Sequence, residues 1–71
     1  MKVINHIRDI RQKKGITQMK MAEDLQVTRQ TIDAIEKSKY NPSLELALKL
    51  IAYFDMPIDD VFILKEENKW V

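Results

Sequence analysis

The polar residues between positions 29 and 37 are the part of the sequence best suited to chemistry with another molecule. Arg29, Asp33 and Lys37 recur every four residues, with Gln30 beside them, so in a helix they share one face. Their guanidinium, carboxylate, ammonium and amide groups are those that proteins use on nucleic-acid bases and phosphates. An ordinary solvated helix presents the same kind of face, so the neighbouring segments must decide between the two interpretations.

Residue types needed for catalysis are scarce. The chain has no cysteine and one histidine, His6, which removes thiol nucleophiles, disulfides and thiolate metal sites. Ser38 and Ser43 fall in a loop and at a helix start, and Asp59 with Asp60 suits the first turn of a helix. We therefore expect no enzymatic activity, no cofactor and no metal.

Two short helices joined by a tight turn are predicted to position the polar face. Thr17 and Thr28 are suited to cap the two helix starts. Each follows an apolar residue, Ile16 or Val27, that can pack on the first turns of its helix and fix the entry angle. Only the segment around Gln26 separates the helices, so they must cross sharply. A polar helix in this setting is more typical of DNA binding than of plain surface.

The remaining chain is predicted to be helical as well. Its single glycine and two prolines fall where helices end or begin. A first helix runs from Asn5, a plausible N-cap, to Gly15, a fourth follows the cap Ser43, and a short fifth follows Pro57. We expect an all-α five-helix bundle over residues 5–62, within one domain of residues 1–71.

Short β-prone runs flank the predicted helices. One lies within residues 1–4 and the other begins near residue 62, and the two could pair as an antiparallel ribbon that buries both termini. Residues 62–71 are then a strand and a tail. The alternative is that the last six or seven residues fray, although Trp70 suggests packing against something.

The fourth helix is apolar on two sides, which exceeds what a small monomer needs. One stripe contains Leu44, Ala47, Leu48, Ile51 and Phe54, and the other contains Leu46, Leu50 and Tyr53. One stripe should face the core and the other a second subunit. The residues expected at a dimer interface are Leu46, Leu50, Tyr53, Phe62 and Leu64.

Charge is distributed unevenly along the chain. Nine basic residues face five acidic ones through Asn41, and three face six in the remainder, so the first part is the better suited to phosphates. No apolar run approaches the roughly 20 residues that span a bilayer, and the first 14 residues lack the apolar core of a signal peptide. We expect a cytoplasmic protein without a membrane partner.

Residues 5–62 resemble the phage-repressor and Cro type of helix-turn-helix regulators, the XRE family. The resemblance rests on the segments IRDIRQKKG, TQMKMAEDL, VTRQTIDAIEK and NPSLELALKLIAYFDMPIDDVF. It implies that the third helix lies in the major groove of double-stranded DNA while the second crosses the backbone. No cofactor is implied.

The resemblance also implies roles for single residues. Arg29 is suited to guanine and Gln30 to adenine, each contact being worth about 1–3 kcal/mol of discrimination. Gln18 is expected near a phosphate or an outer base. Asp33 either accepts from a cytosine amino group and filters sites, or pairs with Lys37 or Arg29. Contacts to the DNA backbone are expected from Thr17, Thr28, Thr31, Lys37, Lys39 and Asn41.

Four further positions matter to the resemblance. Arg11 and Glu36 match an internal pair of the family, so we expect a structural role for both rather than DNA contact. Gln26 stands where many relatives have glycine and must adopt a left-handed conformation. Ala34 replaces a long polar residue of some relatives and can offer only an apolar contact to a thymine methyl group.

The simplest expected function is a repressor that binds a palindromic operator as a homodimer, with half-sites about 34 Å apart. One alternative is an antitoxin, in which the acidic C-terminal part or the second stripe of the fourth helix holds a toxin. A protein-binding adaptor that never touches DNA is a third possibility. The sequence leaves the operator, the regulated genes and any inducer open.

Overall fold

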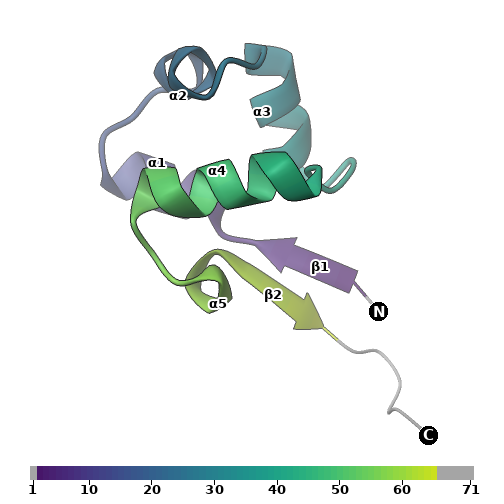
Figure 1. The fold of residues 1–71 in the computed structure, drawn as a ribbon. Helices are drawn as coiled ribbons and strands as arrows, with labels where there is room; N and C mark the ends of the chain where they lie inside the picture. The colour runs from purple at the N-terminus through teal and green to yellow at the C-terminus, as the bar shows by residue number, and fades with distance from the viewer. Residues whose placement is uncertain (1, 66–71) are drawn as a thin grey trace, which may run out of the picture.

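The computed structural model describes residues 2–65, which fold into helices packed above a small β-ribbon (Figure 1). The elements in chain order are β1 (Lys2–Asn5), α1 (Ile7–Lys13), α2 (Gln18–Leu25), α3 (Arg29–Glu36), α4 (Leu44–Phe54), α5 (Ile58–Val61) and β2 (Phe62–Lys65). The five-helix bundle with a terminal ribbon, predicted from the sequence, is confirmed.

The ribbon brings the two ends of the described chain side by side. β1 and β2 pair antiparallel, from Lys2 opposite Lys65 to Asn5 opposite Phe62. A further backbone bond, from His6 N to Val61 O at 2.9 Å, continues this pairing at the start of α1. The expected tail, with Trp70, lies outside the described residues.

Threonine and serine side chains cap the helices as predicted. The hydroxyl groups of Thr17, Thr28 and Ser43 accept hydrogen bonds from backbone N–H groups in the first turns of α2, α3 and α4, at 3.0–3.1 Å. Gly15 and Gln26 take the left-handed conformation, with φ of 71° and 60°. The tight turn between α2 and α3 therefore tolerates a side chain at Gln26.

Asn5 does not cap α1 in the expected way. It belongs to β1, and His6 occupies the cap position without a side-chain cap bond. Pairing with Phe62 holds Asn5 in the strand, yet its side chain still serves α1, because Oδ1 accepts from Ile7 N at 3.3 Å. Its Nδ2 donates to Ile35 O at 3.0 Å, so the side chain ties the start of α1 to α3.

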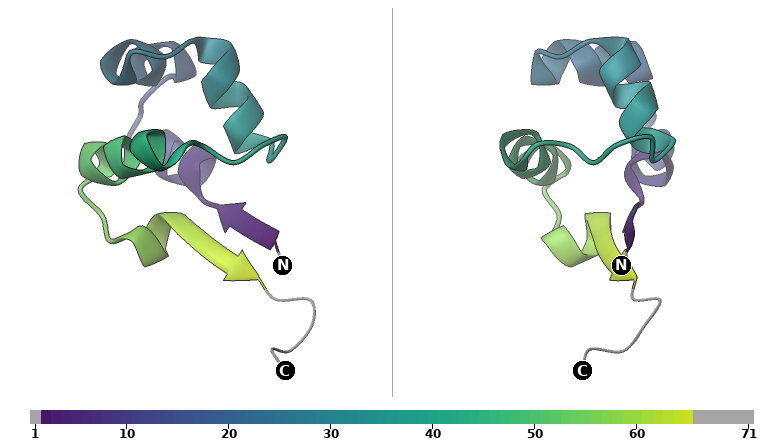
Figure 2. Two further views of the ribbon diagram at one scale, coloured as in Figure 1. Left: turned by 45° about the vertical axis from the view of Figure 1, so that its right-hand side comes forward. Right: turned by 90° about the vertical axis from the view of Figure 1, so that its right-hand side faces the viewer.

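The core receives buried side chains from all five helices. The turned view in Figure 2 places α4 on one side and α1 with α3 on the other. The buried apolar residues are Ile7, Ile10, Met21, Ala22, Leu25, Ile32, Ile35, Leu46, Leu50, Phe54 and Val61. Burying each large side chain among them contributes about 1.5–3 kcal/mol.

The prediction that Leu46 and Leu50 lie at a dimer interface is wrong. Both are buried in this core, with 8% and 0% of their surface exposed, whereas Leu44 and Leu48 are 77% and 56% exposed. Helical periodicity identifies two apolar sides of α4 but does not say which side meets the core. Leu46 and Leu50 are buried together with Phe54, which the sequence analysis had grouped with Leu44 and Leu48 in the other stripe.

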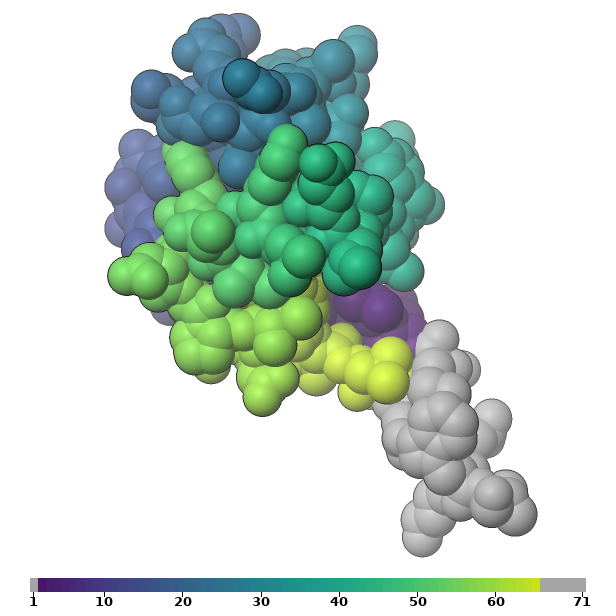
Figure 3. All heavy atoms as spheres, viewed as in Figure 1, coloured from purple at the N-terminus to yellow at the C-terminus, as the bar shows by residue number. Residues whose placement is uncertain are grey.

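The other three residues expected at a dimer interface differ in exposure. Tyr53 and Phe62 are half-buried and pack against the core cluster, while Leu64 is 56% exposed. Figure 3 shows the face on which α4, α5 and β2 come to the surface.

Candidate nucleic-acid interface

The α2–turn–α3 unit presents most of the predicted DNA-contacting residues to solvent. α3 buries Ile32 and Ile35 against the core, which turns its opposite side outward. Arg29 and Gln30, at its N-terminal end, are exposed. The other exposed members of the predicted set are Thr17, Thr28, Lys37, Lys39 and Asn41, and the half-buried ones are Gln18, Thr31 and Asp33.

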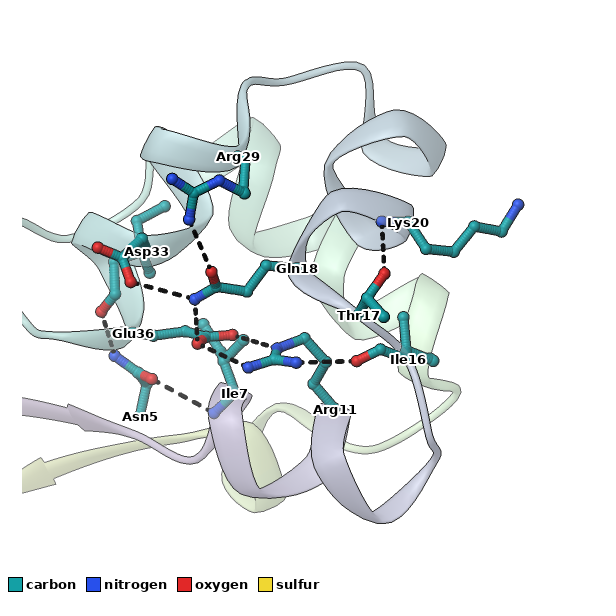
Figure 4. A network of polar contacts seen from close by, with 11 residues as sticks. Asn5, Ile7, Arg11, Ile16, Thr17, Gln18, Lys20, Arg29, Asp33 and Glu36 are labelled. Carbon is teal, nitrogen blue, oxygen red and sulfur yellow. Dashed lines mark hydrogen bonds and ion pairs between the residues drawn. The ribbon is translucent and has the colours of Figure 1, made fainter.

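Gln18 lies at the centre of a polar network that joins α1, α2 and α3 (Figure 4). Its Nε2 donates to Asp33 Oδ1 at 3.1 Å and to Glu36 Oε1 at 3.0 Å. Its Oε1 accepts from Arg29 Nη1 at 3.1 Å. Because an amide nitrogen carries two hydrogens, both donors of Gln18 are engaged within the protein.

Arg11 and Glu36 form the buried part of this network. Arg11 Nε and Nη2 donate to the two oxygens of Glu36 at 2.7 and 3.1 Å, and Nη1 donates to Ile16 O at 2.8 Å. The side chains are only 10% and 2% exposed. Bidentate geometry of this kind is among the strongest for an arginine and a carboxylate. The guanidinium therefore fixes α1 against α3 and the loop before α2.

Asp33 has partners on both oxygens. Its Oδ2 lies 2.9 Å from Lys37 Nζ, one helical turn away, and its Oδ1 accepts from Gln18. Hydrogen bonds from Lys37 and Gln18 hold the pKa of Asp33 below its ordinary value. The sequence had left either Lys37 or Arg29 as the pairing partner, and the structure selects Lys37 as the ion pair.

A concavity of about 560 Å³ opens beside this network. It is lined by Arg8, Arg11, Thr17, Gln18, Met19, Arg29, Asp33 and Lys37, so four basic side chains face one acidic side chain there. Arg8 was not among the residues predicted from the sequence. The available signal was its spacing of three from Arg11, which places both on the same face of α1.

The threonines at the helix starts use their hydroxyl groups locally. Thr28 and Thr31 lie 2.9 Å apart at Oγ1, and Thr28 also caps α3. Each hydroxyl retains further hydrogen-bonding capacity, and their position at the N-terminus of α3 favours negatively charged groups.

A second polar cluster links α4 to α2. Tyr53 Oη donates to Asp24 Oδ2 at 2.6 Å, and Lys20 Nζ lies 3.0 Å from Asp24 Oδ1. The bond to Asp24 raises the pKa of Tyr53 to about 12, and the same bond, with that from Lys20, lowers the pKa of Asp24. Tyr53, expected at a dimer surface, thus has a partner within its own chain.

Among residues 2–65, no three side chains of the metal-ligating types come together. Over the same range, no helix has the length and apolar character needed to cross a bilayer.

Comparison with known proteins identifies the architecture. A family model described as "Helix-turn-helix" matches residues 7–61. A Bacillus subtilis protein named as the uncharacterized HTH-type transcriptional regulator YgzD is 50% identical over 64 residues, covering 90% of this chain and 97% of the relative. Similarly named proteins from Archaeoglobus fulgidus and Methanocaldococcus jannaschii are 47% and 44% identical, each covering 90% of this chain and at least 91% of the relative.

Proposed function

The chain belongs to the XRE-type helix-turn-helix family of DNA-binding transcriptional regulators, and from this premise we propose that it is a repressor acting as a homodimer on a palindromic operator. The observation that carries the proposal is the exposed N-terminal part of α3, where Arg29 and Gln30 lie free of the core. We place its action in the cytoplasm. A repressor of this kind occludes the polymerase, and its two reading helices enter successive major grooves about 34 Å apart.

Arg29 and Gln30 are the proposed base-reading residues. Arg29 uses one N–H on Gln18, which leaves the other donors of its guanidinium for guanine O6 and N7. Gln30 is exposed and forms no side-chain hydrogen bond within residues 2–65, so its amide can pair with adenine N6 and N7.

Gln18 and Asp33 take part in this reading through their neighbours. Both donors of Gln18 and both oxygens of Asp33 are already engaged, so direct base contact requires breaking bonds inside the protein. We propose that Gln18 orients Arg29, and that Asp33 keeps Gln18 and Lys37 in place. A cytosine amino group near Asp33 must compete with Lys37.

Contacts to the DNA backbone are assigned to residues at the edges of the helix pair. Lys39 and Asn41 follow α3 in the loop toward α4 and are exposed. The hydroxyl groups of Thr17, Thr28 and Thr31 lie at helix starts, where phosphate is favoured. Lys37 adds a positive charge at the end of α3. These contacts set the register of the protein on the duplex without reading sequence.

The homodimer requires a surface other than the one predicted on Leu46 and Leu50. Leu64 remains available at 56% exposure, and Leu44 is 77% exposed at the start of α4. We propose that these two leucines, with the ribbon, form the dimer surface. The antitoxin alternative gains no support from the described residues or from the names of the relatives, and we do not propose it.

A titration with specific and scrambled duplexes at two salt concentrations tests the proposal. Arg29→Ala should weaken binding to the specific duplex by about 5- to 150-fold, the equivalent of about 1–3 kcal/mol, and affect the scrambled duplex much less. Lys14→Ala, which removes a charge outside the concavity, is the matched control. Equal losses on both duplexes for Arg29→Ala contradict base reading.

A further inference from the structure

We infer that Arg8 binds a phosphate of the DNA backbone, so that α1 is a third element of the interface beside α2 and α3. The inference rests on the proposed DNA-binding function and deepens it, because it assigns an anion to the concavity beside Gln18. Neither the sequence pattern nor the comparisons assign a role to Arg8.

Arg8 places a basic side chain of α1 beside the residues of α2 and α3 that are proposed to contact DNA. Arg8 lies one turn before Arg11 on α1, and both line the same concavity as Gln18 and Arg29. An anion bound in this concavity therefore lies beside Arg29, the proposed base-reading residue. Phosphates flank the groove that a recognition helix enters, so a concavity beside that helix suits a phosphate better than a base.

The hydrogen bonds around the concavity separate Arg8 from its basic neighbours. All three guanidinium nitrogens of Arg11 donate to Glu36 or Ile16, and Lys37 is paired with Asp33. Arg29 donates to Gln18. Arg8 is exposed and has no ion pair or side-chain hydrogen bond within residues 2–65. Its whole set of guanidinium donors is thus free for an external anion.

The chemistry of the free group fits a phosphate. A guanidinium presents two parallel N–H donors that match two oxygens of a phosphate. Three further basic side chains line the concavity against the single carboxylate of Asp33, so the local field favours an anion. A contact of this kind is insensitive to base sequence and weakens with salt.

Arg8→Ala in the full chain tests the inference through the salt dependence of duplex binding. Loss of one phosphate contact in each subunit of the proposed dimer should lower the slope of log affinity against log salt by about 1.8, which is about 0.9 for each contact. The affinity ratio of wild type to variant then falls roughly 12-fold between 50 and 200 mM salt, equally for specific and scrambled duplexes. Arg8→Lys should recover part of the slope.

Lys13→Ala provides the matched control, because it removes the same charge from the same helix outside the concavity. Its slope should stay closer to that of the wild type than the slope of Arg8→Ala does. Identical slopes for wild type and Arg8→Ala overturn the inference while leaving the proposed function intact. If the wild type binds neither duplex, the proposed function itself fails.

A competition experiment distinguishes the DNA backbone from a free anion. Inorganic phosphate is added to the wild-type complex at constant ionic strength, with chloride as the reference. Equal effects of the two salts support a DNA phosphate. Specific displacement by millimolar phosphate in the wild type, absent in Arg8→Ala, identifies a free-anion site and overturns the assignment. Thermal unfolding of Arg8→Ala should match the wild type, since Arg8 has no hydrogen-bond or ion-pair partner among the described residues.

Discussion

Gln18 is held by three hydrogen bonds, and these bonds limit what it can do at a DNA surface. Its nitrogen donates to two carboxylates, so its oxygen must face Arg29. Reversing the amide would direct N–H groups at the guanidinium and oxygen at the carboxylates, both of which are repulsive. The orientation of Gln18 therefore fixes one nitrogen of Arg29 before DNA is met, which lowers the entropy lost on binding.

The first prediction concerns the coupling between Gln18 and Arg29. If Gln18 acts through Arg29, then Gln18→Ala should reduce the preference for the specific duplex in the wild type but change it little in an Arg29→Ala background. A coupling energy of about 0.5–3 kcal/mol is expected for groups in direct contact. The measurement is a double-mutant cycle on the ratio of specific to scrambled affinities. Additive effects of the two substitutions contradict a positioning role.

The second prediction concerns the buried pair of Arg11 and Glu36. Glu36→Ala leaves the guanidinium without its carboxylate, so the free energy of unfolding should fall by about 3–5 kcal/mol. Replacing both members by apolar residues, as in Arg11→Met with Glu36→Leu, should recover much of this loss because no charge is then left unpaired. Urea unfolding followed by circular dichroism measures both. A double variant less stable than Glu36→Ala contradicts the prediction.

At the scale of elements, the bond between Tyr53 and Asp24 ties α4 to α2 in a pH-dependent way. The pKa of Tyr53 is raised from 10.0 to about 12 in the folded protein, so the folded state holds this proton more tightly. The stability that the Tyr53–Asp24 bond contributes is therefore complete below pH 10 and is lost as the pH rises toward 12. The pKa of Asp24 is lowered from 3.8 in the folded protein. The stability that the ionised Asp24 contributes is therefore present above pH 3.8 and is lost as the pH falls below that value.

The third prediction is the stability profile of Tyr53→Phe. The difference in unfolding free energy between wild type and variant should be constant between about pH 5 and 9 and shrink above pH 10, because only the wild type can lose the tyrosine hydrogen bond. Urea unfolding at pH 7, 9 and 11.5 measures this difference. A difference that persists unchanged at pH 11.5 shows that the bond contributes nothing to stability.

The elements also show what the sequence could predict and why the rest escaped it. Helix caps at Thr17, Thr28 and Ser43 are local, since the capping hydroxyl and its N–H partner lie three residues apart. The ribbon was predictable because few other partners exist for two short β-prone runs. The inner face of α4 was not predictable, because Leu48 and Leu50 are both apolar and only the positions of the neighbouring helices decide which of them is buried.

Long-range polar contacts were the least predictable part of the site. The hydrogen bond between Gln18 and Glu36 depends on the angle at which α2 and α3 cross. The sequence indicates that this angle is sharp but does not give its value. The one sequence signal for Arg8 was its spacing of three from Arg11, and this signal does not distinguish it from an ordinary exposed arginine on a first helix. Its significance arises only when the fold places it on the concavity with Arg29 and Lys37.

For the whole molecule, the two faces have different character. The polar network with its concavity involves α1, α2 and α3, while exposed leucines occur on α4 and β2. In a dimer that binds DNA, the contact between the two subunits must leave the polar network around Gln18 exposed. Leu44 and Leu64 satisfy this requirement, since neither lines the concavity.

The fourth prediction is the assembly state. Light scattering at micromolar concentration should give the mass of two chains, and Leu64→Glu should shift the population toward one chain, because it places a charge in an apolar contact. Lys65→Glu is the matched control, since successive residues of a strand point to opposite faces. A monomeric wild type, or an equal effect of both substitutions, contradicts the proposed dimer surface.

The terminal ribbon has a consequence for the order in which the chain assembles. Lys2 pairs with Lys65, so the ribbon closes a loop that contains every other described residue. Because the loop is the longest in the fold, its closure carries the largest entropy cost. Like charges opposite one another weaken its outer end further. We expect the amide hydrogens of β1 and β2 to exchange with solvent through local opening, while those of α2 and α3 exchange only on global unfolding. Helices α2 and α3 can therefore stay folded while β1 and β2 separate and pair again.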